Sequence, residues 1–126
     1  ERERCRWRVV PYIDAMGEAL AAADLVLSRA GASSIAEIAA LAVPALLVPY
    51  PFATADHQTV NARYLVDAGA AVLLPDDQID TPAFLESLRR LIDDGERRTS
   101  MIVRLWRLRI RSRASRRLVP RRAPLR

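Results

Sequence analysis

Residues 25–48 read LVLSRAGASSIAEIAALAVPALLV and alternate two apolar runs with a loop and an amphipathic segment. The runs at 25–28 and 45–48 have the length and apolar content of buried strands. Between them, residues 33–42 carry apolar side chains at the i, i+3, i+4, i+7 spacing of one helix face, at Ile35, Ile38, Ala39 and Ala42. The stretch predicts a strand, a loop of small residues, a helix and a second strand parallel to the first.

The same alternation continues on both sides of this stretch. We expect a helix over 15–23, a helix over 56–68, a strand over 70–74, a turn over 76–80 and a helix from 81 to about 94. Asp14 is the expected N-cap of the first helix, and Thr81 followed by Pro82 favours the start of the last one. Apolar strands separated by helices predict an α/β fold, a partial Rossmann-like domain whose parallel strands are covered on both faces. Because three strands are few for such a sheet, further strands are expected upstream.

The net charge of +5 is unevenly divided along the chain. Residues 1–96 hold 8 Arg against 15 acidic residues, a net charge of −7, whereas 97–126 hold 12 Arg and no acid, a net charge of +12. The apolar residues of 97–126 keep no regular period for long, so we expect a domain over 1–96 and an Arg-rich tail outside it. Three interpretations of the tail stay open: a solvated run, a surface for nucleic acid or anionic lipid with Trp106 as an anchor, or an out-of-frame translation of GC-rich DNA.

Composition excludes several protein classes. No apolar run reaches the roughly 18 residues of a membrane-spanning helix, and the first residues do not form a signal peptide. The single cysteine, Cys5, cannot form an internal disulfide, and it lies 52 residues before the single histidine, His57, so no metal site is expected. The chain begins without Met, which suggests a piece of a longer protein.

The loop at 28–37, SRAGASSIAE, is the first candidate site. Small residues let a ligand approach the backbone, and the first-turn amides of the following helix form an anion site that suits phosphate. With one glycine the loop is neither a Walker A loop nor a dinucleotide fingerprint, and an ordinary strand–helix turn explains it equally well. Glu37 either closes a capping box with Ser34 or accepts hydrogen bonds from ribose hydroxyls. Arg29 pairs either with a phosphate or with a surface acid such as Asp24.

The loop at 49–62, PYPFATADHQTVNA, is the second candidate site and ends at a helix N-terminus. Asp56 is either the N-cap of that helix or a binding residue. His57 and Gln58 are expected above the strand ends, where ligands bind in open α/β sheets, and Asn61 lies on the same helical face as His57. No second acid or nucleophile lies near His57 in sequence, so it is not assigned a catalytic role.

Blocks from both loops, in this order and spacing, resemble the C-terminal half of the MurG family. These enzymes are the UDP-N-acetylglucosamine:undecaprenyl-pyrophosphoryl-muramyl-pentapeptide N-acetylglucosaminyltransferases of peptidoglycan synthesis. The blocks are VPYIDAM at 10–16, ADLVLSRAGASSIAE at 23–37, VPALLVPYP at 43–51, DHQTVNA at 56–62 and GAA at 69–71. The resemblance covers about 8–94. The looser pattern Asp-x-Gln-x-x-Asn also occurs in other GT-B glycosyltransferases, so an enzyme with another lipid or natural-product acceptor stays an alternative.

The resemblance implies the donor-binding domain of a GT-B glycosyltransferase. Tyr12 and Ile13 would line the uracil pocket, and Glu37 would bind the ribose. The residues that would hold the diphosphate form one loop, Ala30, Gly31, Ala32, Ser33 and Ser34, and Arg29 is counted with them. The side chains of His57, Gln58 and Asn61 would face the diphosphate and the GlcNAc hydroxyls. No metal or cofactor is expected, because helix dipoles would stabilise the leaving UDP.

The resemblance also implies partners for the chain. These are UDP-N-acetylglucosamine as donor, a lipid-linked muramyl-pentapeptide as acceptor, and the cytoplasmic face of the bacterial cell membrane, bound peripherally; no nucleic acid is expected. Transfer would be inverting, and the general base is expected in an N-terminal domain outside these residues. We therefore expect no catalytic residue in this chain and no transferase activity from it alone. A non-enzymatic α/β module with a basic nucleic-acid or membrane-binding tail is the remaining alternative.

Overall fold

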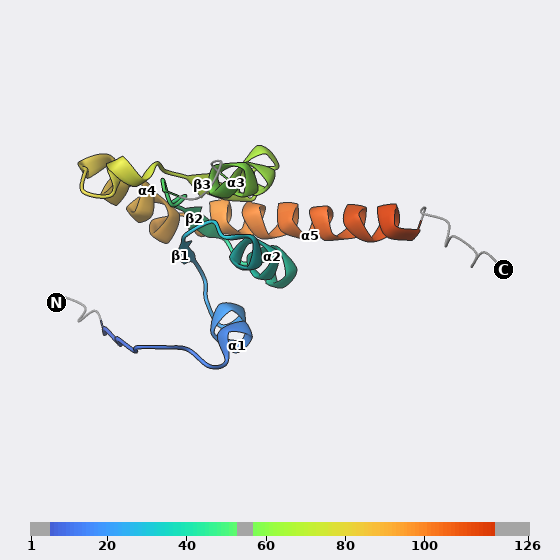
Figure 1. Cartoon of the computed structure of the whole chain (residues 1–126), viewed down its shortest axis with the longest axis horizontal. Coiled ribbons are helices and arrows are strands. Elements are labelled where there is room, and N and C mark those ends of the chain that lie inside the picture. Colours follow the sequence, from blue (N-terminus) through green and yellow to red (C-terminus); the bar gives the residue numbers. More distant parts are fainter. Residues whose placement is uncertain (1–5, 53–56, 118–126) are drawn as a thin grey trace.

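The computed structural model describes residues 6–52 and 57–117 and contains a small parallel sheet surrounded by helices (Figure 1). In chain order the elements are α1 (Met16–Ala21), β1 (Val26–Ser28), α2 (Ala32–Leu41), β2 (Ala45–Leu47), α3 (His57–Asp67), β3 (Ala71–Leu73), the 3-10 helix η2 (Asp76–Gln78), α4 (Pro82–Asp93) and α5 (Gly95–Arg117). The expected alternation of helices and strands is therefore observed, with helix and strand ends shifted by one or two residues.

The sheet has the strand order β1-β2-β3, and both pairings are parallel. Val26 lies opposite Ala45, which in turn lies opposite Ala71. All three residues of the central strand β2 are buried. The α/β fold with a parallel sheet is thus confirmed.

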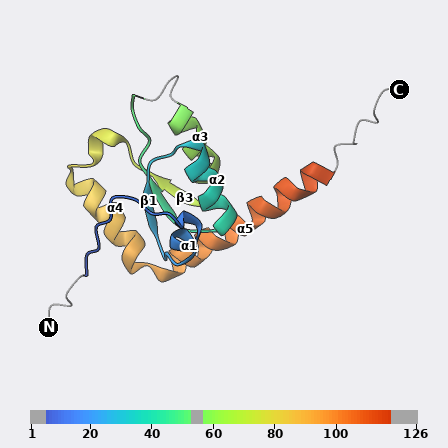
Figure 2. The same cartoon turned by 60° about the horizontal axis from the view of Figure 1, so that its bottom comes forward.

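Helices α2 and α3 cover one face of the sheet and α4 the other, and α5 contributes to both (Figure 2). Ala45 and Leu47 of β2 pack into one apolar cluster with residues of α2, α3 and α5, among them Ile38, Leu65 and Leu105. Leu46 points to the other face, where α4 contributes Phe84 and Leu91 and α5 contributes Met101. This alternation along β2 is the period of two of a strand, and it requires apolar residues at every position because both faces are covered.

One expected helix cap is wrong, and one capping arrangement considered for Glu37 is excluded. Helix α1 begins at Met16, and its N-cap is Ala15 rather than Asp14. Helix α2 begins at Ala32 with Gly31 as N-cap, so Ser34 lies inside the first turn and cannot form a capping box with Glu37. The extended backbone of Gly31, with φ −61° and ψ 152°, starts the helix before the chain reaches the serines.

The other helix starts agree better with the sequence. Thr81 is the N-cap of α4 and Pro82 its first residue, as expected. The hydroxyl of Thr81 donates to the carbonyl of Gln78 at 2.7 Å and makes no bond to the helix. Helix α3 begins at His57, and Asp56, considered as its N-cap, lies outside the described residues.

Helix α5 differs from the expected Arg-rich tail. Met101 is 3% exposed and Leu105 is fully buried, so the first half of α5 packs into the same core as residues before 96. Met101, Leu105 and the partly buried Leu108 are spaced i, i+4, i+7, a helical stripe that the interspersed arginines obscured. Figures 1 and 2 show the C-terminal part of the helix extending beyond the sheet. Among the described residues, no helix combines the length and hydropathy needed to cross a membrane.

Candidate functional site

The candidate site lies where the three strands end. Parallel strands bring their carboxyl ends to one edge of the sheet, so the loops that follow β1, β2 and β3 meet there. The loop after β1 is the shortest: Arg29 and Ala30 separate Ser28 from Gly31, the N-cap of α2. The first amides of α2, on Ala32, Ser33 and Ser34, therefore open at this edge without intrahelical partners, as in any α-helix.

Two amide side chains of α3 hold this loop. Oε1 of Gln58 accepts hydrogen bonds from the backbone N–H of Ala30 at 3.2 Å and from that of Tyr50 at 2.8 Å. Nδ2 of Asn61 donates to the carbonyl oxygen of Ala30 at 3.3 Å. Ala30 itself is fully buried. Gln58 and Asn61, expected to face the sugar and diphosphate, thus use one polar atom each to fix the loop.

Arg29 pairs with a surface acid, one of the two kinds of partner considered for it, but the acid is not Asp24. Its guanidinium pairs with Asp76 of η2, not with Asp24, and donates to the carbonyl oxygens of Val48 and Pro49 at 3.4 Å each. The same group lies 5.6 Å from the centre of the Tyr50 ring, in cation–π range. Arg29 therefore connects the loops that follow all three strands.

A groove of about 570 Å³ adjoins the N-terminal part of α2. It brings together five of the residues predicted from the sequence, Tyr12, Ile13, Ser33, Ser34 and Glu37. Tyr12 is 77% exposed and Ile13 39%, so both present apolar surface to the groove. Since Ser34 is not a cap, the capping role of Glu37 is excluded and its carboxylate lines the groove.

The other residues predicted from the sequence are not among those that line this groove. His57 is exposed at the first position of α3 and is not among the residues that line the groove. Gly31 is half-buried and Ala32 exposed, so a ligand can reach the backbone of both. Sequence reasoning missed Asp76, although its position just after β3 placed it at the same sheet edge as Arg29. It also missed Met16 and Leu20 of α1, which line the groove.

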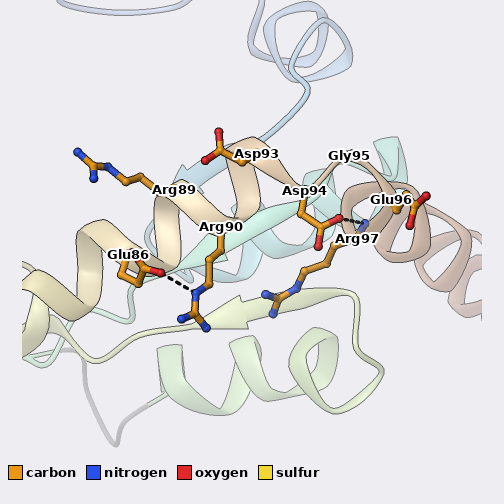
Figure 3. Close-up of a pocket in the computed structure, with 8 residues that line it drawn as sticks. All are labelled: Glu86, Arg89, Arg90, Asp93, Asp94, Gly95, Glu96 and Arg97. Atoms are coloured by element: carbon orange, nitrogen blue, oxygen red, sulfur yellow. Dashed lines mark hydrogen bonds and ion pairs between the residues drawn. The ribbon is translucent and has the colours of Figure 1, made fainter.

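A larger hollow of about 700 Å³ lies at the corner between α4 and α5 (Figure 3). Its lining is charged, with Arg90 paired to Glu86 at 2.8 Å and the backbone N–H of Arg97 donating to Asp94 at 2.8 Å. A helix that follows a parallel strand returns the chain to the opposite edge, so this hollow lies away from the strand ends. We do not assign it to the candidate site.

Comparison with known proteins agrees with this geometry. The model of the glycosyltransferase family 28 C-terminal domain matches residues 2–113 and so reaches into α5. The chain is 54% identical over 92 residues to the UDP-N-acetylglucosamine--N-acetylmuramyl-(pentapeptide) pyrophosphoryl-undecaprenol N-acetylglucosamine transferase of Chlorobaculum parvum, covering 73% of this chain and 25% of the relative. The enzyme of the same name from Methylococcus capsulatus is 47% identical over 94 residues, covering 75% and 27%.

A solved structure also matches. The crystal structure of MurG from Acinetobacter baumannii superimposes with a TM-score of 0.71 at 39% identity, over 78% of this chain and 28% of that one. The chain spans about a quarter of the length of the curated relatives it matches. The match over residues 2–113 shows that the chain belongs to the glycosyltransferase family 28 C-terminal domain family.

Proposed function

We propose that this chain is the donor-binding part of an N-acetylglucosaminyltransferase of peptidoglycan synthesis and that it binds UDP-N-acetylglucosamine. The observation that carries the proposal is the groove in which Tyr12, Ile13 and Glu37 lie beside the N-terminus of α2. An aromatic and an aliphatic side chain suit a nucleobase, a carboxylate suits a ribose diol, and free helix amides suit a diphosphate. The names of the 45–54% identical relatives support the choice of sugar and reaction.

In this proposal the donor lies along the groove toward the loop after β1. Uracil contacts Tyr12 and Ile13, and each ribose hydroxyl donates to one oxygen of Glu37. The diphosphate accepts hydrogen bonds from the amides of Ala32, Ser33 and Ser34. The sugar extends toward α3, where His57, Gln58 and Asn61 lie near the same sheet edge.

The reaction proposed for the whole enzyme is an inverting transfer. The 4-hydroxyl of the lipid-linked muramyl-pentapeptide attacks the anomeric carbon of GlcNAc, and its proton passes to a general base. The bond from the anomeric carbon to the β-phosphate oxygen breaks, and UDP leaves with the electron pair. The helix dipole and amides of α2 stabilise the charge that develops on the leaving phosphate, so this step needs no metal. The acceptor carries an undecaprenyl chain, which would bring the enzyme to the cytoplasmic face of the membrane.

The ribose contact gives the test. Wild-type chain is titrated with uridine and with 2′,3′-dideoxyuridine, and binding is followed by NMR chemical shifts. We expect uridine to bind about tenfold more tightly, the order of a charge-assisted hydrogen bond. Glu37→Ala should abolish this preference without weakening dideoxyuridine. Glu18→Ala, on the exposed face of α1, is the control and should keep the preference. A preference that survives Glu37→Ala would exclude the assigned ribose contact.

A further inference from the structure

Arg29 and Ala30 are held from opposite sides. The side chain of Arg29 binds the loop after β2 through the carbonyl oxygens of Val48 and Pro49, and the segment after β3 through Asp76. The backbone of Ala30 is held by Gln58 and Asn61 of α3. Gly31, the next residue, is the N-cap of α2, so these contacts lie directly before the first helix amides.

Asp76 stands out among these residues because it lies outside both sequence loops that point to the donor. It is the first residue of η2 and its side chain is 30% exposed, while that of Arg29 is 46% exposed. An ion pair at this exposure adds little to stability. It is, however, the charge-assisted contact among three that one guanidinium nitrogen, Nη1, makes to Asp76 and to the carbonyl oxygens of Val48 and Pro49, and it thereby orients the side chain.

We propose that Asp76 is a positioning residue: acting through Arg29, it holds the loop before α2 so that the amides of Ala32, Ser33 and Ser34 face the donor diphosphate. This inference rests on the proposed function, because it concerns how the same site binds UDP. Arg29 is then a tether of the loop rather than a phosphate ligand. The competing arrangement, in which Arg29 binds phosphate directly and Asp76 only neutralises it, makes the opposite prediction for removal of Asp76.

The first experiment measures the affinity of the chain for UDP and for uridine in three variants, Asp76→Asn, Asp76→Ala and the control Asp77→Asn. Asp77 is the exposed neighbour of Asp76, so the control removes the same charge nearby. We expect Asp76→Ala to weaken UDP binding about threefold, the order of one half-exposed charged contact, and to leave uridine unchanged. Asp76→Asn keeps an oxygen that accepts from Arg29 and should recover part of the loss. Asp77→Asn should match the wild type.

Three other results would each overturn the inference. Tighter UDP binding by Asp76→Ala would overturn the inference, because a freed Arg29 would then be attracting phosphate. An equal loss of UDP and uridine binding would also overturn it, since Asp76 would have a general structural role. A wild-type chain that binds UDP no better than uridine would refute the diphosphate site, and with it both the proposed function and this inference.

A second experiment uses the variant Arg29→Lys, which keeps the positive charge at the site. Nζ of lysine lies one bond nearer the main chain than Nη1, the nitrogen that contacts Asp76 and two carbonyl oxygens, so lysine should not reach all three. We therefore expect Arg29→Lys to weaken UDP about as much as Asp76→Ala, with uridine again unchanged. Retention of full UDP affinity by Arg29→Lys would point to a simple point charge on the phosphate and would contradict the tether.

Discussion

At the scale of single residues, one oxygen atom joins two loops of the site. Oε1 of Gln58 accepts from the amides of Ala30 and Tyr50, which follow different strands. A carbonyl oxygen has two lone pairs, so this atom is fully used. Both donors would lose their partner at once if the side chain were shortened, and the loss is costly at Ala30, whose bond is partly buried, while the bond of Tyr50 is exposed.

We predict that Gln58→Ala lowers the free energy of unfolding by about 2 kcal/mol, because two amide donors lose their acceptor. Gln58→Glu keeps an acceptor oxygen and should lose less than half as much. The measurement is urea unfolding followed by circular dichroism. The same truncation at Gln78, where the bonds of η2 are made by the backbone, serves as control and should cost under about 0.5 kcal/mol. Equal losses at the two positions would contradict the special role of Gln58.

At the scale of secondary-structure elements, the end of α3 depends on one glycine. Gly69 has φ +68°, and after it the N–H of Ala70 bonds back to the carbonyl of Leu65 at 2.9 Å, as in a Schellman ending. A Cβ added to Gly69 would lie 2.5 Å from Nη1 of Arg104, a residue of α5. The glycine thus allows the sharp turn into β3 and leaves room for the side chain of Arg104.

Gly69→Ala should therefore destabilise the chain by about 1–2 kcal/mol, mainly from left-handed backbone strain and to a smaller extent from displacing the side chain of Arg104. The double variant Gly69→Ala with Arg104→Ala removes the clash and should recover part of the loss, leaving the strain. Thermal unfolding measures both. Gly17→Ala within α1 is the matched control: nothing lies within 4 Å of its added Cβ, and it should be neutral or stabilising by up to about 1 kcal/mol. A harmless Gly69→Ala would contradict the argument.

The elements also show what sequence alone can predict. The buried strand β2 was predictable because a short apolar run between two prolines is typical of a buried strand and is too short for a helix. The cap of α2 was not, because Gly31 and Ser34 are both acceptable caps and only the tertiary position of the loop decides between them. The contact of Asp76 with Arg29 joins residues 47 positions apart, and one sequence gives no signal for such a pair. The gathering of Tyr12, Ile13 and Glu37 was expected from family resemblance, and periodicity alone would not have predicted it.

At the scale of the whole molecule, the hydrophobic core includes residues from both sides of residue 96, where the net charge of the sequence changes from negative to positive. Met101 and Leu105 of α5 contact apolar clusters on the two faces of the sheet, so a strongly basic segment completes an acidic body. The alternating arginines hid this stripe because they lie on the other faces of the helix. Composition is thus a poor guide to the edge of this domain.

Truncation tests this directly. A chain of residues 1–111 keeps the buried part of α5 and should melt within a few degrees of the full chain. A chain of residues 1–96 loses two buried side chains, worth about 2–5 kcal/mol each, and a small domain has only about 5–15 kcal/mol in total. We expect it to show no cooperative thermal transition by circular dichroism. The point variant Leu105→Ala should fall between the two, and equal melting of both truncated chains would contradict the role of α5.

The position of β1 has a consequence for how the sheet can be extended. Within the described part of the chain, β1 pairs on one side only, with β2. Val26 donates toward β2, so strand alternation turns the N–H of Leu27 to the open side, and the Leu27 side chain is 48% exposed. The unpaired backbone N–H of Leu27, next to an exposed leucine side chain, is a template for the addition of another strand. A strand added to this sheet, such as one of those expected upstream in the sequence, would therefore pair with β1, while the buried strand β2 should be the last to exchange its amide hydrogens.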